Sequence, residues 1–116
     1  MSLVNLDKQR DEYIEKLSAL EVELYSSAKQ EWFEKNATPE EQTAFRKKRI
    51  DLSNTIEELD TIKISKIADK FEANQKALSD GIEELSATIS NLASSIKTLN
   101  QIGTLIGTIS RILLIK

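Results

Sequence analysis

Apolar residues recur every three, four or seven positions along most of the chain, which is the spacing of one face of an α-helix. This pattern predicts a first helix over residues 5–35. Its apolar face consists of Leu6, Tyr13, Leu17, Leu20, Leu24, Ala28 and Trp32. Charged side chains fill the opposite side, as in a helix that is half buried. We expect Trp32 to cover the core where the first two helices meet, because large aromatic side chains are mostly buried.

A sharp turn is predicted at residues 36–38. Thr38 is a typical N-cap, Pro39 suits the first helical position, and Glu41 completes a capping box. A connection this short indicates that the helices on either side are antiparallel neighbours. The second helix is predicted over residues 39–79, with a change of register between Thr61 and Ile67 that has no clear assignment. Its apolar face carries Phe45, Leu52, Ile56, Leu59, Ile62, Ile67, Phe71 and Leu78.

A strict seven-residue repeat follows, and a second row accompanies it at Ile82, Ile89 and Ile96. The main row consists of Ile64, Phe71, Leu78, Leu85, Leu92, Leu99, Ile106 and Leu113. Such rows are typical of coiled coils and of helical bundles.

A break at residues 79–81 (Ser-Asp-Gly) would start a third helix over residues 82–115, and glycine weakens a helix interior. The predicted fold is therefore all-α: an elongated antiparallel three-helix bundle in one domain, residues 1–116. The alternative, favoured by the unbroken repeat, is a short helix folded back on one helix of about 75 residues, roughly 110 Å long.

Composition narrows the function classes. The chain has no Cys and no His, and its net charge is −3. Disulfides, thiolate or imidazole metal sites and His or Cys catalysis are thereby excluded. The acidic pairs at 57–58 and 83–84 fall on polar helix faces, where solvated carboxylates are the ordinary case. We therefore expect no enzyme, no catalytic residue, no metal and no cofactor.

Residues 46–49 (Arg-Lys-Lys-Arg) form the one basic run. Phosphate binding is one interpretation of such a run. Four consecutive helical residues spread around the helix axis, however, so we expect a solvated face whose long stems cover Phe45 and Ile50. The net negative charge gives no overall attraction to nucleic acid, which is not an expected partner.

The last third of the chain differs from the rest, because no acidic residue follows Glu84. Its nearly uncharged apolar stripe predicts a homo-oligomer interface or a docking surface for a partner helix. The predicted interaction residues are Ile82, Leu85, Ile89, Leu92, Ile96, Leu99, Ile102, Gly103, Ile106, Gly107, Ile109 and Leu113.

Membrane association is the alternative interpretation of this region. The spacing of Gly103 and Gly107 is one that lets helices approach closely in membranes, and residues 99–115 would insert as a tail or as part of a pore. Arg111 and several polar residues interrupt that segment, and a spanning helix needs about 20 mostly apolar residues. The N-terminus carries no apolar signal-peptide core, so a cytoplasmic location is expected, with peripheral or tail-inserted membrane association as the alternative.

Overall fold

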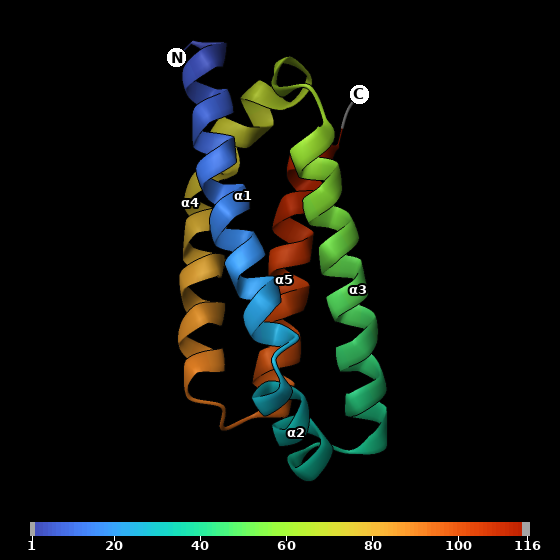
Figure 1. Ribbon diagram of the computed structural model, residues 1–116. Coiled ribbons are helices and arrows are strands. Elements are labelled where there is room, and N and C mark those ends of the chain that lie inside the picture. Colours follow the sequence, from blue (N-terminus) through green and yellow to red (C-terminus); the bar gives the residue numbers. More distant parts are fainter. Residues whose placement is uncertain (1, 115–116) are drawn as a thin grey trace.

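The computed structural model of the protein describes residues 2–114, of which 89% are helical and none forms a strand. The helices in this range are α1 (Leu3–Leu24), α2 (Ser27–Asn36), α3 (Pro39–Thr61), α4 (Ile64–Ser90) and α5 (Ser95–Leu113). Four of them lie side by side in an elongated bundle of 48 × 25 × 19 Å, and the short α2 covers one end (Figure 1). The predicted all-α helical bundle is confirmed, although it contains four long helices and not three.

Viewed along the bundle, the four long helices α1, α3, α4 and α5 lie at the corners of a square. Helix α1 packs on α3 and α4, and α5 also packs on α3 and α4. Consecutive helices α3 and α4 therefore stand at opposite corners, and the chain crosses between them at the end of the bundle opposite α2 (Figure 1). Helices α1 and α4 run in the same direction and are therefore parallel neighbours (Figure 1).

The predicted helix 5–35 is interrupted at Tyr25 and Ser26. The Ser26 hydroxyl accepts a hydrogen bond from the amide of Lys29 at 3.4 Å and so caps the start of α2. The interruption changes which side of the helix meets the core. Phe33 becomes buried, with 2% of its surface exposed, whereas Trp32 is half-buried and forms a T-shaped pair with Phe33. Trp32 packs against the core as expected, while Phe33, which was not expected there, is buried within it.

The predicted turn at 36–38 and the start of α3 at Pro39 are confirmed. The amide of Glu41 donates to the Thr38 hydroxyl at 3.1 Å, and the Thr38 amide donates to the Glu41 carboxylate at 2.9 Å. The Ser95 hydroxyl donates to the same carboxylate oxygen at 2.9 Å, which joins the first turns of α3 and α5. The hydrogen bond from the Thr38 backbone, followed by that from Ser95, lowers the pKa of Glu41.

The predicted break at residues 79–81 is wrong, because α4 continues through it. A Cβ atom added to Gly81 would lie 3.3 Å from the Leu105 side chain. The glycine therefore marks a close approach between α4 and α5, which is one of the established uses of glycine. The second predicted helix instead ends at Thr61, where the apolar register changes.

The break that separates the last two helices lies at residues 91–94. The Ser94 hydroxyl accepts a hydrogen bond from the Lys97 amide at 3.1 Å and caps α5. Just before it, the Ser90 hydroxyl donates to the Ser86 carbonyl at 2.8 Å, and such local bonds compete with the helix. The alternative helix of about 75 residues is thus also wrong, because the repeat continues across a loop. Of the predicted helix 82–115, the last residue, Ile115, lies outside the described residues.

Helix α5 contributes a full-length strip to the core. Its fully or almost fully buried residues are Thr98, Leu99, Ile102, Leu105, Thr108, Ile109 and Ile112. The two buried threonines donate to the carbonyls of Ser94 and Thr104, one turn earlier, at 2.9 and 3.1 Å. Their hydroxyls are therefore satisfied without a partner from another helix.

Candidate interaction surfaces

The predicted interaction stripe is mostly buried against other helices of the same chain. Six of its members are buried, namely Ile82, Leu85, Ile89, Leu99, Ile102 and Ile109. Another five are half-buried, namely Leu92, Gly103, Ile106, Gly107 and Leu113. Ile96 is the exposed member, at 59%. The loop at 91–94 rotates α5 relative to the seven-residue repeat, so Leu105 and Ile112, which lie outside the main row, take central core positions in its place.

The two glycines of the last helix lie in different surroundings. A Cβ atom at Gly103 would lie 3.2 Å from Nζ of Lys48, whereas one at Gly107 would have no atom of residues 2–114 within 4 Å beyond its own helix backbone and chain neighbours. Gly107 therefore does not serve a close helix contact within this chain. Among the helices of residues 2–114, none is long and apolar enough to cross a membrane.

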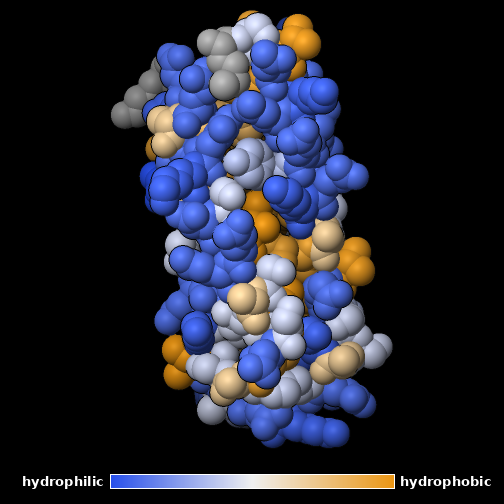
Figure 2. All heavy atoms as spheres, turned by 90° about the vertical axis from the view of Figure 1, so that its left-hand side faces the viewer, coloured by the Kyte–Doolittle hydropathy of each residue, from blue (hydrophilic) through white to orange (hydrophobic). Residues whose placement is uncertain are grey.

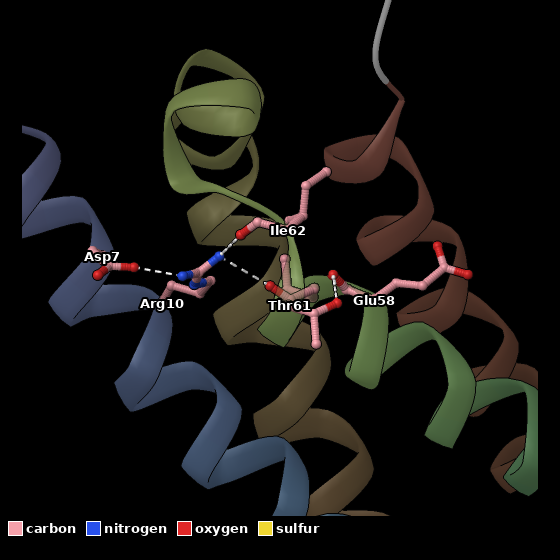
Figure 3. A network of polar contacts seen from close by, with 6 residues as sticks. Asp7, Arg10, Glu58, Thr61 and Ile62 are labelled. Carbon is pink, nitrogen blue, oxygen red and sulfur yellow. Dashed lines mark hydrogen bonds and ion pairs between the residues drawn. The ribbon is translucent and has the colours of Figure 1, made fainter.

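Two buried arginines join α1 and α3 at opposite ends. Near the start of α1, Nη1 of Arg10 donates to the carbonyl of Leu59 at 3.2 Å and to the carbonyl of Ile62 (Figure 3). Its Nη2 donates to Asp7 at 2.5 Å. These carbonyls end α3, where the helix dipole favours a cation. Arg10 therefore caps α3 from the neighbouring helix.

Arg49 of α3 makes the reciprocal contact. Its Nη1 donates to the carbonyl of Leu24, at the end of α1, at 3.2 Å. Its guanidinium carbon lies 4.5 Å from the Tyr25 ring centroid and 4.4 Å from that of Phe45. Burial is the main cause that lowers the pKa of Arg49, which nevertheless stays charged at neutral pH. The sequence interpretation of a solvated basic face is wrong for this residue, and Ile50, expected to be covered, is 56% exposed.

An open groove lies between the parallel helices α1 and α4. It encloses about 230 Å³, and its walls are formed by Lys16, Ala19, Leu20, Glu23, Ile82 and Ser86. A shallower hollow of about 390 Å³ continues along α1 past Glu12, Glu15 and Ala19. Figure 2 looks onto this side of the molecule and shows a hydrophobic patch at mid-height that extends toward the right-hand edge, with hydrophilic surface on its left. Val22, one turn after Ala19, adds a side chain that is 71% exposed.

Three acidic side chains of α1, Glu12, Glu15 and Glu23, line the groove and its shallow continuation, together with the cation Lys16. Residues 12–24 of α1 carry four acidic and one basic side chain, and residues 76–90 of α4 carry three and one, so the net charge here is −5. The remaining parts of both helices, residues 3–11 and 64–75, are each neutral. The negative charge of these two helices therefore lies in the segments that contain the groove residues, although one of the counted side chains, Glu21, accepts a hydrogen bond from Ser53 of α3.

The two acidic pairs noted in the sequence are not brought together by the fold. Residues 57–58 and 83–84 are exposed on different helices. Within residues 2–114 there is no group of three or more acidic side chains placed to hold a metal ion. Glu83 is exposed and directly follows Ile82, one of the two residues of α4 in the groove wall.

Sequence reasoning missed the groove and both buried arginines. A signal for the groove was present, because Ala19 and Val22 are small or apolar residues on the charged side of the first helix. No family model matches the chain, and neither a curated protein nor a solved structure shows significant similarity to it. The function is therefore inferred from the surface of the molecule itself.

Proposed function

We propose that the protein is a non-enzymatic, cytoplasmic interaction protein that binds a positively charged amphipathic helix of a partner protein. The binding site is the groove between α1 and α4. The observation that supports this proposal is the combination of an apolar floor with an acidic border on one half of one face.

The shape of the groove suits a helix. Two neighbouring helices form a furrow in which a third helix can lie with its apolar side inward. The lining on α1 extends from Glu12 to Glu23, about 18 Å at 1.5 Å per residue, which corresponds to roughly three helical turns. Leu20 and Ile82 form the floor, and the exposed side chains of Ala19 and Val22 offer further apolar surface at the border.

The charge of the groove selects the partner. An apolar helix without charges would bury acidic side chains of the border without compensation. A helix with Lys or Arg on both sides of its apolar stripe would place cations opposite Glu12, Glu15 and Glu83. Opposite charges across an interface favour encounter and discriminate against acidic partners, and the effect weakens as salt is added.

The two uses of α5 considered from the sequence receive less support. Oligomerisation through the heptad stripe and insertion of residues 99–115 both require α5 to leave the bundle. That step would expose five buried leucine and isoleucine residues of α5. At about 1.5–3 kcal/mol each, the loss is roughly 7–15 kcal/mol, which is as large as the whole stability of an ordinary domain.

The proposal is tested with a designed lysine-rich amphipathic peptide of about 15 residues, the length at which isolated helices become stable. Fluorescence anisotropy of the labelled peptide is measured against the full chain. A triple variant with Glu12, Glu15 and Glu83 replaced by Gln removes three charges at the groove. Its matched control replaces Glu57→Gln, Glu58→Gln and Asp60→Asn, three exposed acidic side chains of α3.

The groove variant should bind about tenfold more weakly, since each rim charge contributes a few tenths to 1 kcal/mol, and the control should bind like the natural chain. A peptide with Glu in place of Lys should not bind. Equal weakening in both variants would show that net charge alone attracts the peptide and would overturn the proposal. Light scattering of the chain alone should give the mass of one chain; a larger mass that falls in the groove variant would assign the groove to a second copy instead.

A further inference from the structure

A second cavity lies at the end of the bundle that α2 covers. It encloses about 160 Å³, and its walls are formed by Gln30, Phe33, Glu34, Gln42, Phe45, Arg46 and Arg49. It is separate from the α1/α4 groove, with which it shares no lining residue. Two of the four residues of the basic run, Arg46 and Arg49, thus line one cavity.

Aromatic rings and a guanidinium form a column along this cavity. The rings of Phe33 and Phe45 are stacked in parallel, with centroids 3.8 Å apart and an angle of 1°. The guanidinium of Arg49 covers the other side of Phe45, and its carbon also lies 4.5 Å from the centroid of the Tyr25 ring. Both faces of Phe45 are therefore occupied, so it can offer only its edge to the cavity. The edge of an aromatic ring carries the positive end of its quadrupole.

The cations of this cavity have no carboxylate partner. The three ion pairs of residues 2–114 involve neither Arg46 nor Arg49, although Glu34 is also in the wall. Arg46 donates to the hydroxyl of Thr43 at 3.3 Å. The Arg49 residue is buried, with 6% of its surface exposed. Its Nε atom has no hydrogen-bond acceptor among the described residues. Arg46 also acts on Arg49 as a like charge, which lowers the pKa of Arg49 further.

We infer that this cavity binds a small oxyanion, either a phosphate group or a carboxylate, between the guanidinium of Arg46 and the column of Phe45 and Arg49. Three features favour a negative charge in this cavity: the guanidiniums of Arg46 and Arg49, which have no carboxylate partner, and the edge of the Phe45 ring. Guanidinium groups form strong charge-assisted hydrogen bonds with both kinds of oxyanion. A bound anion would also relieve the repulsion between the two arginines.

The neighbouring lysines supply the control. Lys47 adjoins Arg46 in sequence but is not in the wall of the cavity, and its side chain is exposed. Arg46→Gln and Lys47→Gln remove the same charge from adjacent residues of one helix. Both residues are exposed in α3, so neither change disturbs the core. A general attraction of anions to α3 would be weakened equally by the two variants, whereas a site in the cavity depends on Arg46.

Binding is measured with the full chain by isothermal titration and by the thermal midpoint, with inorganic phosphate or acetate exchanged for chloride at constant ionic strength. We expect the midpoint to rise with oxyanion concentration, because a ligand of the folded state stabilises it. Arg46→Gln should weaken the apparent Kd about tenfold or more, and Lys47→Gln should leave it within about twofold.

The two anions distinguish the sources of the ligand. Response to phosphate alone would assign the site to a phosphate group, and response to both would show that a single carboxylate suffices. Either result supports the inference if it depends on Arg46. The inference is overturned if neither anion raises the midpoint beyond the effect of chloride, or if the two variants weaken binding equally.

Discussion

The guanidinium of Arg10 holds the end of α3 that lies opposite α2. It donates to the carbonyls of Leu59 and Ile62 and to the carboxylate of Asp7 (Figure 3). The substitution Arg10→Met keeps an unbranched apolar stem of similar length and removes every donor. It therefore leaves two carbonyls at the end of α3 without their partner while most of the packing is retained.

The size of the effect follows from opposing contributions. Hydrogen bonds from a charged donor contribute about 1.5–3 kcal/mol each, and a cation at a helix C-terminus adds about 0.3–1 kcal/mol. Against this, the substitution releases a buried cation, 10% exposed at its side chain, whose Nε has no acceptor. Removing such a charge returns part of its desolvation cost. We expect a net loss of about 2–4 kcal/mol in the free energy of unfolding.

Urea unfolding followed by circular dichroism measures this loss. Arg111→Met is the matched control, because Arg111 is exposed and its hydrogen bond goes to Thr108 of the same helix at 3.2 Å. The control should change stability by less than about 0.5 kcal/mol. If Arg10→Met were as mild as Arg111→Met, the proposed capping of α3 by α1 would be refuted.

Three further predictions concern single positions. Gly107→Ala should stabilise the chain by about 0.5–1 kcal/mol, because the new methyl group meets no described atom within 4 Å. Gly81→Ala should stabilise it less, because its methyl group would crowd Leu105 of α5. The urea midpoints of the two variants measure both effects. Phe33→Ala should cost about 3–5 kcal/mol and Trp32→Ala clearly less, by the same assay; a larger loss at Trp32 would contradict the deeper burial of Phe33. The lowered pKa of Glu41 implies a stabilising contribution that is complete above the ordinary glutamate pKa of 4.5 and is lost as the pH falls through the lowered value. Glu41→Gln should therefore flatten the acid side of a plot of stability against pH, and an unchanged acid side would show that the hydrogen bonds to this carboxylate do not contribute.

The turn before α3 could be predicted because its signal is local. Thr38, Pro39 and Glu41 each satisfy a backbone requirement of the first helical turn, and no distant contact is needed to recognise them. The helical class and most core positions of α1 and α3 followed from periodicity for a similar reason. One side of each helix meets the same neighbours over its whole length.

The later helix boundaries could not be predicted, because they depend on distant packing. Gly81 resembles a helix breaker in the sequence, but its purpose becomes visible only when Leu105 is placed beside it. The true break at 91–94 has neither Gly nor Pro, and the heptad repeat continues across it. The only local signs are Asn91 and Ser94, residues that favour turns and caps in many other settings as well.

The dependence on distant packing also explains why the sequence predicted the stripe of α5 as the interaction surface and missed the groove. An apolar stripe indicates burial, but periodicity alone does not tell whether the chain or a partner covers it. In the structure, α3 and α4 cover α5. The groove, by contrast, combines Ala19 of α1 with Ile82 of α4, which lie far apart in sequence. Only the parallel packing of these two helices brings an apolar floor and an acidic border together.

Chemical-shift mapping tests most directly whether the interaction surface is the α1/α4 groove. The isotope-labelled full chain is titrated with the lysine-rich amphipathic peptide, and the amide signals that move are assigned to residues. We predict that the largest changes occur at Ala19, Val22, Ile82 and Ser86, with little change at Thr104 and Ser110 on the exposed side of α5. Changes concentrated on α5, or spread evenly over the acidic side chains of all helices, would contradict the assignment of the groove.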